Sequence, residues 1–210
     1  MAKKAKSTLI NMLLSLTLIA LVAAGALALV NNVTEEPIKI AKENKVNKAI
    51  RDVLMQVNPN GDTTKIVFDT IVNNTIKIGD PNEEGKYKDS VVCHLAYTSD
   101  NEYVGAAVEA MDFNGFGGTL KVMVGFDANG DIYGYQVLES SETPGLGAKA
   151  GKWFQNDGKG NIIGKHTADG LEVKKDGGDV DAISGSTITS RAFLRCINKA
   201  YTNLQTVLNK

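Results

Sequence analysis

The sequence is short of cysteine, of aromatic residues and of net charge, and each shortage excludes a class of function. The 210 residues include only two cysteines, which lie far apart and show neither a C-x-x-C motif nor any other metal-ligand or iron–sulfur spacing. The net charge is −1 and aromatic residues make up 6% of the chain, so the sequence offers neither a basic stripe for nucleic acid nor a platform on which bases stack. We therefore expect no metal site and no nucleic-acid partner.

Common hydrolase motifs are also missing. The chain contains no G-x-S-x-G and no H-E-x-x-H sequence. Cys93 and His94 are neighbours, but adjacent side chains on a strand point to opposite faces and would not act together. These features disfavour a hydrolase. Cys93 and the distant Cys196 leave two interpretations open, namely a disulfide outside the cytoplasm or two buried thiols.

The N-terminal region contains an apolar run that is long enough to cross a membrane. Residues 9–30 are mostly apolar and would form a helix of about 33 Å, against a bilayer core of about 30 Å. Lysines precede the run and Glu35 and Glu36 follow it, which predicts a cytoplasmic N-terminus and an exported domain. A cleaved signal peptide is the alternative, because Ala24-Gly25-Ala26 fits a cleavage site; the length of the run favours a retained anchor.

The rest of the sequence predicts an α+β fold with an antiparallel-rich sheet and packed helices. Pro37 is expected to begin a helix that ends at the breaker residues 58–62. Asn129-Gly130 predicts a hairpin turn, and its glycine is wrongly placed for an EF-hand calcium loop. Strands are expected at 90–97, 103–109, 119–126 and 132–138, shorter strand or connecting pieces at 66–69 and 75–78, and an amphipathic helix after residue 187.

Two glycine-containing loops carry the main chemical signal. One is Glu-Thr-Pro-Gly-Leu-Gly at 142–147, and the other is Ser-Gly-Ser-Thr at 184–187, directly before the final helix. A helix N-terminus offers free N–H groups and a partial positive charge, and Gly185 lets the backbone approach a bulky ligand. Thr187 is therefore placed to hold or esterify a phosphate. Judged on the residues alone, a helix cap is the favoured interpretation of Thr187.

The run from Asp181 to Ser190 resembles the flavinylation motif of the FMN-binding domain family, whose usual form is Asp, two residues, Ser or Thr, Gly, Ala and Thr. Segment 142–147 is similar to that family's second signature, and segment 115–118 is similar to a third. With its N-terminal anchor and short length, the chain resembles the G subunits of Rnf electron-transport complexes within this family. The C subunits of sodium-pumping NADH:quinone reductases are relatives with the same domain.

The resemblance implies FMN bound covalently through its phosphate to Thr187, attached by a separate flavin transferase that uses FAD and a divalent metal. Asp181 would belong to the sequence that the transferase recognises. Ser186 stands where alanine is usual, which puts a second hydroxyl beside the acceptor. Further cofactor-binding residues are expected to be Ser184, Gly185, Glu142, Thr143, Pro144, Gly145, Leu146 and Gly147, with Lys149 and Lys174 as charge partners of the phosphate.

The implied organisation is a cytoplasmic N-terminus at 1–8, a transmembrane helix at 9–30, a helical stalk with the N-terminal part of the exported domain at 31–90, and an FMN-binding domain at 91–210. The exported domain would lie on the outer (periplasmic or extracellular) face of the bacterial cytoplasmic membrane. The implied function is electron transfer in a complex that couples ferredoxin:NAD oxidoreduction to sodium or proton translocation, with other Rnf-type subunits as partners. The chain would be one redox subunit and not a complete enzyme. The equivalent subunit of a quinone reductase, or a membrane-tethered interaction module without cofactor, remains the alternative.

Overall fold

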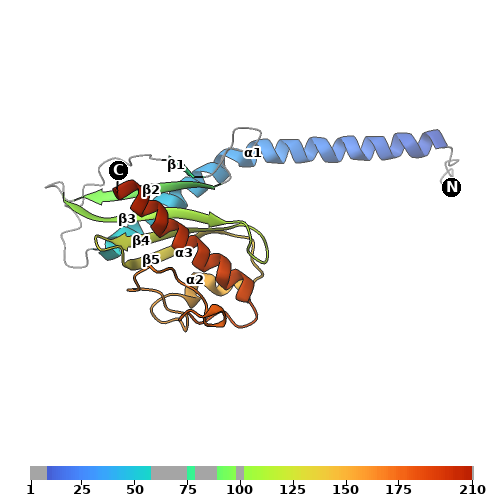
Figure 1. The fold of residues 1–210 in the computed structure, drawn as a ribbon. Helices are drawn as coiled ribbons and strands as arrows, with labels where there is room; N and C mark the ends of the chain where they lie inside the picture. The colour runs from blue at the N-terminus through green and yellow to red at the C-terminus, as the bar shows by residue number, and fades with distance from the viewer. Residues whose placement is uncertain (1–8, 58–74, 79–88, 98–101, 210) are drawn as a thin grey trace. The chain divides into compact units, whose positions relative to one another are not determined.

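The computed structural model describes residues 9–57, 75–78, 89–97 and 102–209 (Figure 1). These residues fall into two compact units that divide after Lys45. The first unit contains most of helix α1 (Leu9–Val57). The apolar side chains near the start of α1 are exposed, and α1 is the one helix of the described residues that is long and apolar enough to cross a membrane. The candidate membrane span expected from the sequence is thus confirmed as a helix.

Helix α1 continues through Pro37, so the prediction that this proline begins a separate helix is wrong. Proline in a helix interior removes one backbone donor and introduces a local clash, which favours its placement in the first turn. Here good helix formers follow it, and the helix runs on to Val57. The last turns of α1, from Val46 onwards, belong to the second unit.

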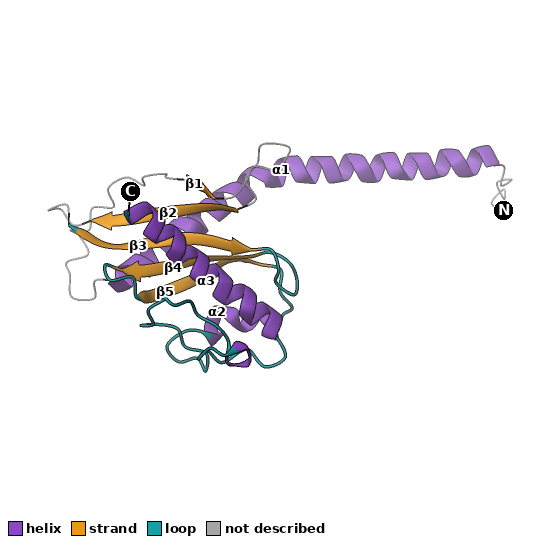
Figure 2. Cartoon of the chain, viewed as in Figure 1, coloured by secondary structure: helices purple, strands orange, loops and turns teal. Residues whose placement is uncertain are grey.

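The second unit is built on one antiparallel sheet with the strand order β1-β2-β3-β4-β5 (Figure 2). The predicted strands are confirmed, with β3 and β5 two or three residues longer than expected and the bounds of the others within one residue. The expected piece at 66–69 lies outside the described residues. The strands are β1 (Thr75–Ile78), β2 (Asp89–Tyr97), β3 (Tyr103–Asp112), β4 (Leu120–Asp127) and β5 (Ile132–Ser140).

A tight turn joins β4 to β5, as the sequence predicts. Gly130 adopts a φ of +87°, which glycine tolerates, and its N–H donates to the Asp127 carbonyl at 3.1 Å. The Asp127 carboxylate accepts hydrogen bonds from the backbone N–H groups of Asn129 and Asp131, both at 2.9 Å. The Asp127 carboxylate thus stabilises the turn by accepting backbone hydrogen bonds, which explains an acidic residue at this position.

Helices pack on both faces of the sheet (Figure 2). Because side chains alternate along a strand, Val108 faces helix α3 (Thr187–Leu208) while its neighbour Ala107 faces the end of α1. Gly125 allows the close approach on the α1 side, since a β-carbon there would collide with the Val53 side chain. The fold is therefore α+β, as expected.

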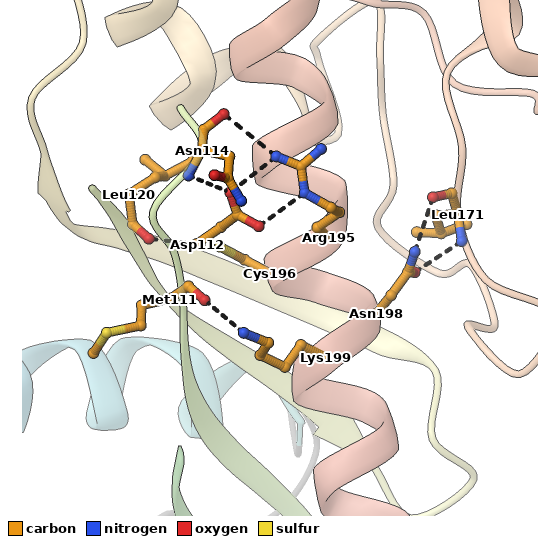
Figure 3. Close-up of polar contacts among 9 residues, drawn as sticks. All are labelled: Met111, Asp112, Asn114, Leu120, Leu171, Arg195, Cys196, Asn198 and Lys199. Carbon is orange, nitrogen blue, oxygen red and sulfur yellow. Dashed lines mark hydrogen bonds and ion pairs between the residues drawn. The ribbon is translucent and has the colours of Figure 1, made fainter. Parts of the chain in front are cut away.

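Cys93 of β2 and Cys196 of α3 are free and buried in the core between the sheet and the helix, in agreement with the thiol interpretation. Burial raises the pKa of the Cys93 thiol to about 11 and that of Cys196 to about 12. The Cys196 thiol lies 3.6 Å from the Leu120 carbonyl oxygen, which it faces as a weak donor (Figure 3). Both side chains therefore act as small apolar groups of the core.

An ion pair holds α3 to the end of β3 (Figure 3). Nε and Nη2 of Arg195 donate to the two carboxylate oxygens of Asp112, at 2.8 and 2.9 Å, and Nη2 also donates to the Asn114 carbonyl at 3.4 Å. Burial alone would raise the pKa of Asp112, but the Arg195 guanidinium and the Asn114 N–H outweigh it and hold that pKa below its usual value. One turn later, Lys199 donates to the Met111 carbonyl at 3.2 Å.

Arg195→Met should lower the free energy of unfolding by about 1–2 kcal/mol at pH 7, because the buried carboxylate loses both guanidinium bonds while solvent screens the half-exposed arginine. The folded pKa of Asp112 is depressed, so this stabilisation is present above about pH 4 and disappears as the pH falls through the folded value. Urea unfolding of the full chain in detergent at several pH values measures the difference in the free energy of unfolding between the parent and Arg195→Met. Arg51→Met, on an exposed position of α1, is the control and should stay within about 0.5 kcal/mol of the parent. Equal stabilities of Arg195→Met and the parent at pH 7 would contradict the expectation.

Candidate functional site

The start of α3 is an open helix end. Gly185 has a φ of +76°, Ser186 occupies the capping position, and Thr187 is the first helical residue. No side chain caps this end, and the first bond along the helix runs from the Ser190 N–H to the Ser186 carbonyl at 3.0 Å. The N–H groups before Ser190 have no acceptor within the helix and suit an anion. Thr187 is therefore not the capping residue, which removes one of the two interpretations of this motif.

The loop at 142–147 forms a compact turn after β5. The Thr143 carbonyl accepts hydrogen bonds from the N–H groups of Leu146 and Ala148, at 3.2 and 3.3 Å. Gly145 has a φ of +79°, which residues with a β-carbon rarely adopt. The chain then enters a 3₁₀ turn (Gly147–Lys149) and the single-turn helix α2 (Ala150–Trp153). Leu146, near the end of this turn, lies beside the start of α3, since its side chain is 3.7 Å from the β-carbon position of Gly185.

The two loops and a third segment enclose one hollow of about 360 Å³. This volume lies within the range of small-molecule sites. The third segment is the tight loop at 115–118, in which the Gly115 and Gly118 backbones hydrogen-bond to each other. The hollow is lined by Phe116, Glu142, Thr143, Leu146, Gly147, Lys175, Gly185, Ser186, Thr187, Ile188 and Thr189.

Apolar side chains stand exposed around this hollow. Phe116 is 69% exposed, and Leu146 and Ile188 are also exposed. Phe116 and Leu146 come from two different loops and Ile188 from the first turn of α3, so together they offer an apolar rim on several sides. Exposed apolar groups gathered at a concave site are typical of a binding site for a ligand with an apolar surface.

Glu142 is buried beneath the hollow, with 7% of its surface exposed. Its Oε2 accepts a hydrogen bond from the Thr189 hydroxyl at 2.8 Å and a longer one from the Gly117 N–H at 3.4 Å. A β-carbon on Gly115 would collide with the same carboxylate, and one on Gly147 would lie 2.5 Å from Oε2. Gly115 and Gly147 therefore leave room for the Glu142 carboxylate. The sequence alone does not reveal this reason for the two glycines.

Not every residue expected at the site lines this hollow. Gly145 and Lys149 line a separate hollow of about 670 Å³ around Trp153. Asp181 forms an ion pair with Lys174 at 2.8 Å, so Lys174 already has a carboxylate partner. The exposed Ser184 and Pro144 belong to the two loops but do not line either hollow.

Four residues that line the hollow were not among the cofactor-binding residues expected from the sequence, namely Phe116, Lys175, Ile188 and Thr189. Lys175 is the charged residue among them. It lies in a 3₁₀ turn, Lys174–Asp176, which is fixed by Arg191 of α3. Nε and Nη2 of Arg191 donate to the Asp176 carboxylate at 2.6 and 2.5 Å. Arg191 lies one helical turn after Thr187, so the pair sets the turn and its lysine beside the start of the helix. The Asp176–Arg191 spacing in the sequence carries no recognisable signal of this contact.

Comparison with known proteins matches residues 115–202 to the FMN-binding domain family. The chain is 31% identical to the G subunit of an ion-translocating oxidoreductase complex of Shewanella oneidensis, over 89% of this chain and 85% of the relative. A protein of the same description from Shewanella amazonensis is 32% identical over 86% and 80%, and one from Yersinia pestis is 31% identical over 92% and 89%.

The chain belongs to the family of ion-translocating oxidoreductase G subunits. The family expected from the sequence is thus confirmed. In this member of the family, the segment matched to the FMN-binding domain begins at Gly115 and ends within α3, so it contains all the residues that line the hollow of Thr187.

Gly147→Ala should lower the free energy of unfolding by about 1–3 kcal/mol, because the added methyl group must displace the Glu142 and Thr189 side chains. Gly151→Ala is the matched control: it lies four residues later, in α2, with open space around its β-carbon position. That change should be neutral or slightly stabilising. Thermal unfolding of the two full-length variants compares them, and equal destabilisation by both would refute the steric explanation.

Proposed function

We propose that this chain is an electron-transfer subunit that carries FMN as a phosphoester on Thr187. The observation that carries the proposal is the position of the Thr187 hydroxyl at an uncapped helix start, inside a hollow with an exposed apolar rim. The free N–H groups of the helix end suit a phosphodiester, and a planar ring system would cover the apolar rim. When bound, FMN supplies the redox chemistry, since it can accept and donate electrons.

The residues of the chain then hold and orient the group. Lys175 supplies a positive charge at the hollow that holds the acceptor hydroxyl. Leu146 and Phe116 cover apolar surface, which also excludes water from the site. Ser186 carries a second hydroxyl, but its side chain is 7% exposed while that of Thr187 is half-buried, which favours Thr187 as the acceptor.

The family places the chain in a larger assembly. We propose that its partners are the other subunits of an Rnf-type membrane complex, which couples ferredoxin:NAD oxidoreduction to sodium or proton translocation. Relatives described as G subunits favour this complex over a sodium-pumping NADH:quinone reductase. The apolar part of α1 would anchor the chain in the bacterial cytoplasmic membrane, with the lysines at its start inside and the FMN domain outside. A separate flavin transferase would attach the FMN.

Thr187→Ala should abolish covalent flavin. Full-length protein from a host that expresses a flavin transferase should have the mass of the bare polypeptide plus one covalently attached FMN moiety. It should also fluoresce in a denaturing gel. The Thr187→Ala variant should show neither property, whereas Ser186→Ala, the matched control beside it, should keep both. Bare polypeptide in the parent protein would end the proposal of covalent attachment, and label retained in Thr187→Ala would end the assignment of the site.

Lys175→Met should slow flavinylation a few-fold, because an exposed charge next to a phosphate contributes about 0.2–1 kcal/mol. The initial rate is measured with purified flavin transferase, FAD and a divalent metal. Lys159→Met removes an exposed lysine from the separate hollow around Trp153 and should leave the rate unchanged. High salt should narrow the difference between Lys175→Met and the parent. Equal rates at low salt would exclude a role for Lys175.

A further inference from the structure

Glu142 differs from the other residues of the hollow because it is a buried carboxylate with one unsatisfied oxygen. Its Oε2 accepts the Thr189 and Gly117 hydrogen bonds, whereas its Oε1 is buried without any hydrogen-bond partner. No ion pair to Glu142 occurs among residues 102–209, where the hollow lies. Among these residues, the negative charge of the Glu142 carboxylate is stabilised only by the two hydrogen-bond donors and by the partial positive charge at the start of α3.

The contacts of this carboxylate tie three segments together. Glu142 comes from the loop after β5, Thr189 from α3, and Gly117 from the loop after β3. The loop after β3 is tied to α3 a second time where it begins, by Arg195 and Asp112 (Figure 3). The two ties fix the loop that bears Phe116 against the helix that bears Thr187.

These hydrogen bonds do not require a negative charge. A glutamine has nearly the same shape, and its amide oxygen would accept both bonds without the free-energy cost of burying an ion. The carboxylate must also avoid two flanking loops, and glycines at 115 and 147 leave the space for it. The charge itself therefore needs an explanation beyond the geometry.

We propose that Glu142 is a positioning residue that fixes the walls of the hollow and, through its negative charge, lowers the reduction potential of the bound flavin. This inference rests on the proposed function. Adding an electron to the flavin adds negative charge, and a buried carboxylate nearby opposes it because little solvent screens the interaction. The partial positive end of α3 opposes this effect without cancelling a full charge.

Three variants separate the charge from the geometry in the full-length, flavinylated protein. Glu142→Gln keeps the acceptor and removes the charge, so the midpoint potential in a spectroelectrochemical titration should shift to a more positive value. Thr189→Val keeps the charge and removes one tie, so the potential should shift less, while flavin fluorescence anisotropy should fall as the walls loosen. Glu139→Gln removes an exposed carboxylate from β5 and should leave both measurements unchanged, because water screens it.

An unchanged potential in Glu142→Gln would overturn the electrostatic role, and unchanged anisotropy in Thr189→Val would overturn the positioning role. If Glu142→Gln does not fold, because its amide group places a buried donor where Oε1 has no partner, Glu142→Met takes its place, since it removes the charge without adding a donor, and an unchanged potential there would overturn the electrostatic role. Absence of flavin from the parent protein is a different result, since it would end the proposed function before this inference is reached.

Discussion

The packing of α3 across the sheet is the constraint on which the rest of the second unit depends. Its buried stripe covers the strands, and Arg195, in the middle of the helix, is held by the carboxylate of Asp112. With the helix fixed in this way, its first residue falls where the loops after β3 and β5 meet. Thr187, in the first turn of α3, lines the hollow because the rest of the helix is held in place by its packing in the core.

The elements that the sequence predicted best are those governed by local rules. The Asn129-Gly130 turn signal correctly predicted a hairpin, and the strands expected on either side of it pair in the sheet. The grouping of Thr187 with the loop of Gly147 was also foreseeable, because each segment resembles a signature of one domain family. Pro37 was misread because proline at a helix start and proline inside a long helix look alike in sequence.

The contacts that the sequence could not reveal join residues that are distant in the chain. Glu142 meets Thr189 across 47 positions, and Arg195 meets Asp112 across 83. Lys175 lines the hollow because Arg191 fixes its turn, and no spacing rule encodes such a bond. Glycine was expected to admit a ligand, yet at position 147 it makes room for a side chain of the same protein.

The state of the two thiols has a consequence for where this domain can mature. Both are unpaired in the core, and burial raises their pKa values well above neutrality, so neither thiolate is available to react. A fold without cross-links needs no oxidising enzymes and is indifferent to the redox poise of its compartment. The fold would be equally stable in a reducing and in an oxidising compartment.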